Sequence, residues 1–394
     1  MPDYGKAKVV WILGTGFSVP LGGPMLKDLL SLGLHSELEA KYHLDTPAMR
    51  DLLRLYHYGR MFPEGKVGLD DRERKGSILW EHAEDFLDVL DTYDETKSTA
   101  GEDRFRAILM PYHLGVANPA TIREILLVAK QHIAAEVCAF LDRNLDASER
   151  WRPYLSWAKD LLGPLDTIVT FNYDCVLERL NEKVGTDPDS QHIDVVDNDG
   201  IAEWANIKKV RALKLHGSVN WVANDDGKGG TKYDKSTDYE HAVKAPLERT
   251  ILATPGPGKF RARTALAKWW DKAKESISTA DAIVFIGYRF PPSDSDARSE
   301  LLGALAGNKK EKLLNIHTVL GPEQNKDTAR LEEMIRYTMA RSKRVAAKEG
   351  GSPPKEKFSY FLQVNQLYAQ DFMSLASRPQ LFSSGTMLDG EVLA

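Results

Sequence analysis

Four short segments of the sequence carry glycine, amide, imidazole or charged side chains directly after apolar runs. They are Gly14–Ser18, Phe171–Asp174, Leu215–Ser218 and Gly287–Phe290. Short apolar runs rich in β-branched residues are typical of strands that are covered on both faces of a parallel sheet. Because the carboxyl ends of such strands meet in one crevice, we expect a glycine turn, a carboxamide and an imidazole to share one rim. That combination suits a nucleotide-processing site.

The glycine turn Gly14-Thr15-Gly16 ends the apolar run Val9–Leu13, and Gly22-Gly23-Pro24 precedes a helical pattern that begins at Met25. Glycine adopts positive φ without penalty, and its missing side chain lets a phosphate approach backbone N–H groups closely. A helix that begins just after such a turn adds unpaired N–H donors and a favourable dipole. The pattern predicts a strand, a phosphate-binding turn and a helix entrance, with an empty strand-to-helix turn as the alternative.

Three familiar cofactor motifs are missing from the sequence. Val19 stands where a dinucleotide-oxidoreductase fingerprint has its third glycine, and the region about 20 residues further on resembles a helix rather than a strand that ends in an acid. No GxxxxGKS or GxxxxGKT motif and no HExxH motif occurs. The two cysteines, Cys138 and Cys175, are too few for a disulfide framework or a four-cysteine zinc site. Hydride transfer and P-loop ATP hydrolysis are therefore disfavoured, and we expect no metal.

The bulk composition excludes several classes of protein. The chain has 394 residues, of which 42% are hydrophobic, and a net charge of -5. These values are typical of a globular protein with more than one domain and give no support to nucleic-acid or acidic-membrane binding. No apolar segment reaches the roughly 18 residues of a membrane span, and the N-terminus lacks the hydrophobic region of a signal peptide. We expect a cytoplasmic protein without a membrane or nucleic-acid partner.

Apolar periodicity predicts strands that alternate with helices. The expected strands after Val9–Leu13 are Leu165–Phe171, Val210–Leu215, Ile251–Thr254, Ala282–Gly287 and Leu313–Leu320. The expected helices are Met25–Tyr42, Glu81–Tyr93, Thr121–Leu145, Asp174–Val184 and Thr264–Ile277, with a further helix start at Ser293–Asp296 and a hairpin or loop at Ala223–Tyr239. This alternation predicts an α/β fold: a Rossmann-like, doubly wound parallel sheet with a large helical insertion and a C-terminal extension.

Domain boundaries follow from the same pattern. The α/β domain is expected over residues 1–24 and 160–325, a helical insertion over 25–159, and a helical or extended tail over 326–394. Within these, we expect a mobile loop at 59–76 and a solvated basic loop at 341–357, because both segments are charged and contain glycine. Five tail aromatics are expected to pack that end onto the body or onto a neighbouring subunit: Phe358, Tyr360, Phe361, Tyr368 and Phe372.

The order of the four motifs resembles the sirtuin superfamily. Its signatures are GAGIS with a following GxP, then TQNID, HG and a glycine-led NAD-binding turn, and the corresponding segments here are GTGFS with GGP, TFNYD, LHG and FIGYRF. The match covers residues 6–24 and 160–322. Sirtuin deacylases carry a zinc module with two CxxC pairs, whereas Ala223–Tyr239 at that place contains no cysteine. The chain is therefore most similar to the zinc-less bacterial sirtuin-like NAD hydrolases of anti-phage defence.

The resemblance implies NAD as the substrate, no zinc, and a set of site residues. The implied catalytic-pocket residues are Asn172, Asp174 and His216, with His216 as the catalytic imidazole. The implied cofactor-binding residues are Gly14, Thr15, Gly16, Phe17, Ser18, Gly217, Gly287, Tyr288, Arg289 and Asn315. In the relatives the position of Arg289 is often a serine, and Asn315 is the weakest match of the set.

Structural roles compete with each chemical role. Asn172 can cap a helix or turn, and Asp174 can be the N-cap of the helix that follows it. His216 can be a buried structural histidine, and the Ser18 hydroxyl can stabilise its own turn. The functional and structural interpretations of these four side chains both stay open at the level of sequence.

The chemistry of NAD cleavage fits the side chains on this rim. Nicotinamide leaves as a neutral amide from an oxocarbenium-like sugar, so no general acid is needed for its departure. Asn172 can orient an attacking water, and His216 can accept a proton from the water or from a ribose hydroxyl. We expect an NAD glycohydrolase that releases nicotinamide and ADP-ribose. The alternatives are an NAD-dependent protein deacylase, an enzyme that cyclises NAD, and a non-catalytic NAD or ADP-ribose sensor.

The resemblance also implies a cellular role as an NAD-depleting effector of abortive anti-phage immunity. Toxic consumption of NAD requires restraint, so we expect a homo-oligomer or a partner-dependent switch. The partner expected from the resemblance is a HerA-type ATPase or helicase, or another defence component.

Overall fold

The computed structural model describes the chain over residues 6–61, 80, 82–95, 120–206, 209–225, 231–245, 249, 251–253, 258–291, 294–309, 313–323, 326–341, 345–346 and 359–382. The chain forms two compact units. The sheet unit comprises Met1–Gly23, Arg143–Gly217 and Leu266–Ala394, and the helical unit comprises Pro24–Asp142 and Ser218–Ala265. These boundaries differ from the expected ones: residues 143–159 and the tail belong to the sheet unit, and 218–265 belong to the helical unit.

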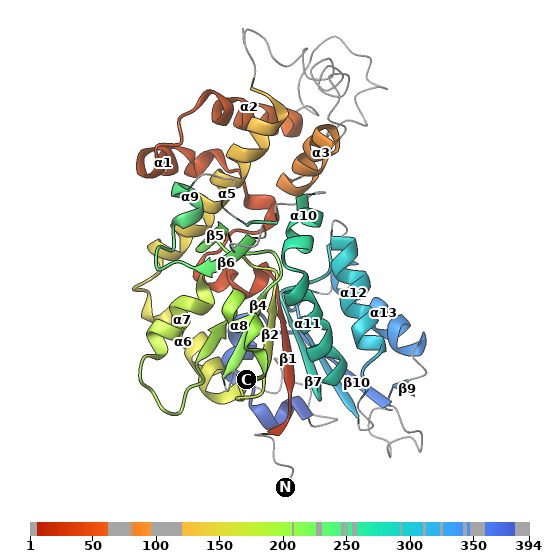
Figure 1. The fold of residues 1–394 in the computed structure, drawn as a ribbon. Coiled ribbons are helices and arrows are strands. Elements are labelled where there is room, and N and C mark those ends of the chain that lie inside the picture. The colour runs from red at the N-terminus through yellow and green to blue at the C-terminus, as the bar shows by residue number, and fades with distance from the viewer. Residues whose placement is uncertain are drawn as a thin grey trace. The chain divides into compact units, whose positions relative to one another are not determined.

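A parallel sheet is the centre of the sheet unit (Figure 1). Over the described residues it has eight strands in the order β3-β4-β2-β1-β7-β8-β10-β9, and all of its pairings are parallel. The strands are β1 (Val9–Leu13), β2 (Thr167–Thr170), β3 (Ile193–Val195), β4 (Val210–Lys214), β7 (Ala282–Ile286), β8 (Leu314–Val319), β9 (Val345–Ala346) and β10 (Ser359–Asn365).

The strand order is that of a Rossmann fold. The run β4-β2-β1-β7-β8-β10 reproduces the 3-2-1-4-5-6 order of doubly wound sheets, and β3 and β9 extend the two edges. The chain leaves β1 toward β2 on one side and later returns to place β7 on the other side, so the order reverses between β1 and β7. Every residue of these two strands is buried, because both faces of the sheet are covered. The expected fold class is confirmed.

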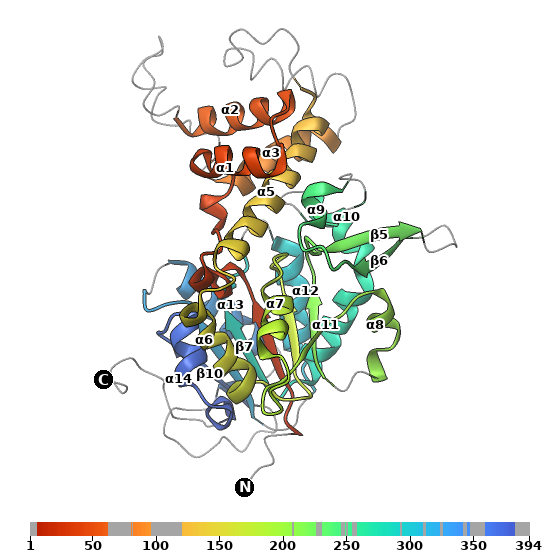
Figure 2. The same ribbon diagram turned by 90° about the vertical axis from the view of Figure 1, so that its left-hand side faces the viewer.

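Helices cover the two faces of the sheet (Figure 2). On one face α11 (Ala267–Thr279), α12 (Ser295–Ala306) and α13 (Lys326–Arg341) pack against one another in sequence. On the other, α6 (Ser148–Ser156) packs against α7 (Val176–Val184) and α14 (Ala369–Leu375). The remaining short elements of this unit are η2 (Thr15–Phe17), η3 (Val19–Leu21), the π-helical turn η7 (Trp157–Leu161), α8 (Asn198–Ala202), η8 (Trp204–Asn206) and η11 (Arg378–Phe382).

The helical unit contains η4 (Leu26–Asp28), α1 (Leu32–Tyr42), α2 (Pro47–Met61), α3 (Ala83–Glu95), α5 (Ile122–Arg143), α9 (His241–Lys244) and α10 (Gly258–Ala265). An antiparallel hairpin of β5 (Trp221–Asp225) and β6 (Thr231–Lys235) belongs to the same unit, as expected for this turn-rich segment. The helix expected over Thr121–Leu145 is confirmed as α5, along which the apolar residues Ile122, Ile125, Leu126, Ala129, Ile133, Val137 and Phe140 are buried. Over the described residues, no helix is long and apolar enough to cross a membrane.

Two expectations for single elements are wrong, and one strand lies in the tail, where no particular strand was expected. The helix expected from Met25 begins only at Leu32, because Leu30 adopts a positive φ of 59° that an α-helix does not accommodate. Where a strand was expected over Ile251–Thr254, the described residues 251–253 contain a single β-bridge residue, Leu252. The tail contributes β10, which pairs with β8 from Tyr360 to Asn365, so it is part of the sheet rather than an appendage. Most of 59–76 and 341–357, as well as Phe358, lies outside the described residues.

Candidate active site

Two glycine turns touch at the point where the strand order reverses. Gly14 follows β1 and donates its N–H to Ile286 O at 3.0 Å, and Gly16 donates to Gly287 O at 3.4 Å. A Cβ atom on Gly14 would lie 2.6 Å from Gly287 O, and one on Gly16 would lie 2.6 Å from Gly287 Cα. Gly287 itself has a φ of +63°, a region that favours glycine. The three glycines are therefore required for the close approach of the ends of β1 and β7.

The turn after β1 differs from the expected phosphate cradle and helix entrance. Its N–H groups are largely donated inside the protein: Phe17 N to Gly14 O and Ser18 N to Thr15 O, each at 2.9 Å. The chain then continues through the 3₁₀ turns η2 and η3. Because Pro20 and the left-handed Gly22 follow at once, no α-helix forms directly after the turn. Phosphate binding by these amides stays a prediction, and backbone packing already accounts for the glycines.

Phe17 supports this turn from inside the protein. Its ring is buried and meets the rings of Tyr154 and Trp157 edge-on, with centroid distances of 5.1 Å in both cases. The Tyr154 hydroxyl donates to the Phe17 carbonyl oxygen. The accessible part of the turn consists of Thr15 and Gly16, which are half-buried. The side chain of Phe17 is therefore placed for packing, and only its backbone lies at the crevice.

Asn172 lies beside the glycine turn, two residues beyond β2. Its Nδ2 donates to Gly14 O at 2.9 Å and contacts Ser18 Oγ at 3.0 Å. A backbone carbonyl only accepts hydrogen bonds, so the nitrogen of the amide must face Gly14 and the oxygen must face away from it. Asn172 is only 8% exposed, and over the described chain its Oδ1 has no hydrogen-bond partner. Buried acceptors in folded proteins are almost always satisfied, so this oxygen is the atom of Asn172 that is left to accept a hydrogen bond from a ligand.

Asp174 and Ser18 hold Asn172 in this orientation. The Ser18 hydroxyl donates to Asp174 Oδ2 at 2.6 Å, and Asp174 Oδ1 accepts from Val176 N at 3.0 Å in the first turn of α7. Burial raises the pKa of Asp174, and the nearby Lys214 charge together with the Ser18 hydrogen bond opposes part of that rise. Each carboxylate oxygen thus accepts one hydrogen bond that holds Asp174 in place, and the direct catalytic contact that the resemblance implies stays a prediction.

Lys214 is a component of the site that sequence reasoning missed. It is the last residue of β4, is fully buried, and donates from Nζ to Glu178 Oε1 at 2.9 Å and to the Asp174 carbonyl. Burial is the largest influence on the pKa of Lys214 and acts to lower it, but Glu178, Cys175 and Asp174 together outweigh burial, so the pKa is raised and the ammonium keeps its charge. The sequence signal that could have identified Lys214 is a lysine inside the apolar run before His216, because a lysine that is buried in a strand requires a charged partner.

His216 lies at the end of β4 against an aromatic pair. Phe171 and Tyr288 stack with parallel rings at a centroid distance of 3.9 Å, and the His216 ring meets Phe171 edge-on at 5.0 Å. The Tyr288 hydroxyl donates to Asp294 Oδ2 at 2.9 Å, and Asp294 Oδ1 lies 3.9 Å from His216 Nε2. The imidazole is 9% exposed. The structure therefore brings His216, Tyr288 and the Asn172 segment to one edge, as expected, and adds Asp294 behind the imidazole.

Gly217, Arg289 and Asn315 differ in how they relate to this edge. Gly217 follows His216 with a φ of +81° and turns the chain there. Arg289 Nη2 donates to Leu320 O at 2.7 Å, so the arginine supports the loop after β8. Asn315 is placed elsewhere: it pairs in register with Ala282 at the amino end of the sheet, whereas the crevice lies at the carboxyl ends. The structure does not bring Asn315 to the site, and its predicted cofactor contact is corrected on this ground.

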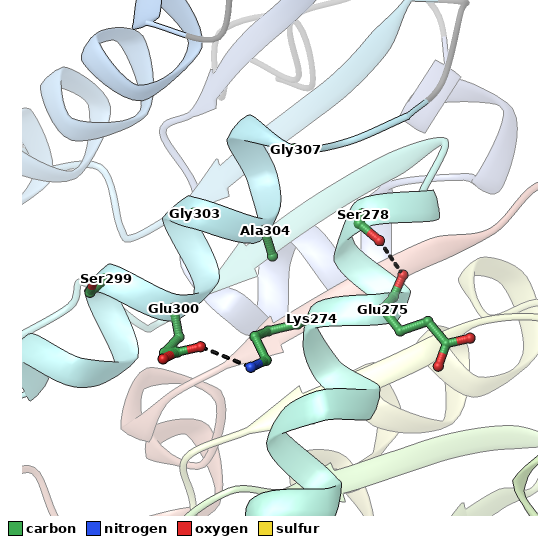
Figure 3. A pocket seen from close by; sticks show the side chains of 8 residues that line it. All are labelled: Lys274, Glu275, Ser278, Ser299, Glu300, Gly303, Ala304 and Gly307. Carbon is green, nitrogen blue, oxygen red and sulfur yellow. Dashed lines mark hydrogen bonds and ion pairs between the residues drawn. The ribbon is translucent and has the colours of Figure 1, made fainter.

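Another concavity lies between α11 and α12 (Figure 3). Lys274 bridges to Glu300 at 3.0 Å across it, and Gly303 is part of its wall. None of the candidate residues lines this pocket. Over the described chain, no group of three or more histidine, cysteine, aspartate or glutamate side chains could hold a metal ion.

Comparison with known proteins adds little to this geometry. No protein-family model matches the chain, and a search of curated proteins returns no match. Among solved structures, one described as "Structural Basis for the Mechanism and Regulation of Sir2 Enzymes" is similar over 86% of this chain and 95% of its own, with 12% sequence identity and a TM-score of 0.23. At these values the likeness carries no weight for residue roles, and the Rossmann-like assignment rests on the strand order described above.

Proposed function

We propose that this protein hydrolyses NAD at the nicotinamide–ribose bond and releases nicotinamide and ADP-ribose. The observation that carries the proposal is the buried Oδ1 of Asn172, which has no hydrogen-bond partner among the described residues and lies beside the touching glycine turns of β1 and β7. In open α/β sheets, ligands bind in the crevice where the strand order reverses. The motif order shared with the sirtuin superfamily supports NAD as the ligand of this crevice.

The Asn172 side chain is suited to stabilise the positive charge that develops on the ribose. Cleavage leaves a neutral nicotinamide and a sugar that carries developing positive charge, so an oriented oxygen dipole stabilises the transition state more than the ground state. The same oxygen can accept a hydrogen bond from the attacking water and hold it in line. Because its Nδ2 is fixed by Gly14 and Ser18, the dipole is aimed before the substrate arrives.

His216 suits the proton transfer. An imidazole titrates near neutral pH and can take a proton from water or from a ribose hydroxyl as the new C–O bond forms. Asp294, held by the Tyr288 hydroxyl, lies behind Nε2 and can stabilise the imidazolium that results.

The test is quantification of nicotinamide after incubation of purified protein with NAD, with any activating partner supplied. We expect Asn172→Ala and His216→Ala to lower the rate about 100-fold or more, the usual effect of losing a positioned dipole or base. Asn308→Ala is the matched amide control, since Asn308 donates to the Ile277 and Ala280 carbonyls within the α11–α12 layer. His192→Ala is the histidine control. Equal rates for wild type and both site variants would falsify the proposal.

The same assay separates the rival activities. A deacylase forms O-acyl-ADP-ribose only when an acylated peptide is present, and a cyclase forms cyclic ADP-ribose without a peptide. A sensor binds NAD in a calorimeter and leaves it intact after long incubation. A role in anti-phage immunity, with restraint by a homo-oligomer or a partner, is the cellular part of the proposal. It predicts NAD loss in infected cells that disappears with Asn172→Ala.

A further inference from the structure

A fully buried lysine lies beneath the candidate site. Lys214 at the end of β4 is paired with Glu178 on α7 and also donates to the carbonyl of Asp174. A buried ion pair is weak evidence for stability, because the cost of removing both charges from water offsets much of their attraction. A lysine at this position therefore calls for another explanation.

A chain of hydrogen bonds leads from the Asp174 carboxylate to the side-chain amide of Asn172, and Lys214 is joined to the same residue through its backbone carbonyl. The Asp174 carboxylate accepts the Ser18 hydroxyl proton at 2.6 Å, and Ser18 Oγ in turn accepts from Asn172 Nδ2 at 3.0 Å. A hydroxyl has one proton to donate. Because Ser18 gives it to Asp174, its oxygen is left to accept from Asn172, and every direction in the chain is set.

The direction of the chain depends on the charge of Asp174. As a carboxylate, Asp174 can only accept, so Ser18 must donate to it and the nitrogen of Asn172 must face Ser18. A neutral Asp174 could donate to Ser18 instead, and the serine proton would then compete for the place of the Asn172 nitrogen. Burial favours the neutral form of Asp174, and the Lys214 charge is the largest influence that opposes it.

We propose that Lys214 is a positioning residue that acts through Asp174 and Ser18 to aim the Oδ1 of Asn172 at the reacting ligand. The proposal rests on the proposed function for its kinetic readout. The contacts that define it are buried within the sheet unit and are independent of the identity of the ligand.

The experiment removes the lysine without leaving the charge of Glu178 unpaired. Lys214→Met alone strands the carboxylate of Glu178, so the informative variant is Lys214→Met combined with Glu178→Met, which replaces a buried pair by apolar side chains of similar length. We expect kcat for nicotinamide release to fall by about 10- to 100-fold, as for other small misplacements of a reacting group, with a smaller change in KM. Ser18→Ala interrupts the chain in its middle and is expected to give the same loss. Arg211→Met removes a cation from the same strand outside the chain and is the control.

Two further readouts distinguish positioning from mere stability. In an Asn172→Ala background, the Lys214→Met/Glu178→Met pair should lower kcat no further, because effects that pass through one residue are not additive. Independently of activity, the side-chain amide of Asn172 is followed by NMR in selectively labelled protein and identified by its loss in Asn172→Ala. We expect its slow proton exchange to be lost in both chain variants and kept in Arg211→Met.

The outcomes separate the two proposals. If wild type releases no nicotinamide, the proposed function fails, and the amide readout alone judges Lys214. If the Lys214→Met/Glu178→Met protein keeps both the wild-type kcat and the protected amide, the positioning role is overturned. Additive losses in the Asn172→Ala background overturn it as well.

Discussion

Arg378→Met is expected to destabilise the sheet unit strongly, because it removes the positive charge that pairs with the buried carboxylate of Asp166. Arg378, in η11, donates from Nη1 to Asp166 Oδ2 at 2.7 Å and from Nη2 to Asp166 Oδ1 at 2.9 Å. Arg378 also donates to the carbonyls of Leu161 and Ala7, each at 2.8 Å. The arginine therefore ties the end of the chain to the segments that precede β1 and β2.

The magnitude follows from what the deletion leaves behind. Asp166 is fully buried and would keep only neutral donors, namely Trp11 Nε1 and the amides of Val9 and Gly163. Breaking one side of a buried ion pair costs about 3–5 kcal/mol, because the other charge stays buried and uncompensated. For a unit of this size, 1 kcal/mol corresponds to roughly 2–4 °C, so the thermal midpoint is expected to fall by about 6–20 °C.

The loss should depend on pH in a defined direction. Burial raises the pKa of Asp166 above its ordinary value of 3.8, and the Arg378 hydrogen bonds oppose that rise. Without Arg378 the native pKa rises further, so the folded state binds a proton more readily than the unfolded state over a wider range above 3.8. The stability difference between wild type and Arg378→Met is therefore largest at neutral pH and shrinks as pH falls through that range.

The assay is thermal unfolding by circular dichroism from pH 4.5 to 8. Arg152→Met is the control, since Arg152 is 79% exposed in its side chain and forms only a 4.0 Å pair with Glu149. It should change stability by less than about 0.5 kcal/mol. If Arg378→Met lowers the midpoint no more than Arg152→Met at pH 7, or if its deficit grows on acidification, the reasoning about the buried pair is refuted.

Two further predictions concern the glycine turns and a buried histidine. Gly16→Ala should lower both the thermal midpoint and the affinity for NAD, because its methyl group would overlap Gly287. The control is Gly303→Ala, which has nothing within 4 Å of its added methyl group and should raise the free energy of unfolding by up to about 1 kcal/mol. Equal thermal midpoints for the two variants would contradict the packing argument. His317 is buried with a pKa lowered to about 4 by burial, which its hydrogen bond to Leu381 only partly opposes. The histidine therefore binds a proton near pH 6.5 in the unfolded chain but not in the native protein, and about 3 kcal/mol of the free energy of unfolding should be lost as pH falls from 6.5 to 4. Urea unfolding of His317→Gln should show a smaller loss of stability on acidification. An unchanged loss would exclude His317 as its source.

The sequence by itself determined the central strands and the order of the chemical segments. Runs such as Val9–Leu13 and Ala282–Ile286 are apolar at every position, which only a strand covered on both faces satisfies, so the sheet and the edge that carries the site were predictable. The place of Asn172 and His216 at this edge was predictable for the same reason, since each follows a strand end, and their roles stay predictions. The short strands at the two edges and β10 were not predictable. In β10, Ser359–Asn365 mixes polar and aromatic residues, a pattern that does not distinguish a strand of the sheet from an extended tail.

Tertiary structure alone decided what the individual side chains do. The phosphate contact expected of Gly14 and Gly16 stays a prediction, whereas the structure shows that both lie against Gly287, about 270 residues further along the chain. Asn315 follows the expected strand pattern, yet the strand register places it at the wrong end of the sheet. Neither fact is local: each depends on which strands are neighbours and in which register, and that is set by packing over the whole sheet.

The same limit applies to the direction of the Asn172 amide. Its residue type and its position after β2 are legible in the sequence, but the orientation of its oxygen depends on Gly14, Ser18 and Asp174, which meet it only in the folded chain. Hydrogen-bond directions are fixed by partners that converge from distant segments. The sequence thus supplies the groups that can do chemistry, and the tertiary structure decides which of their atoms face a ligand.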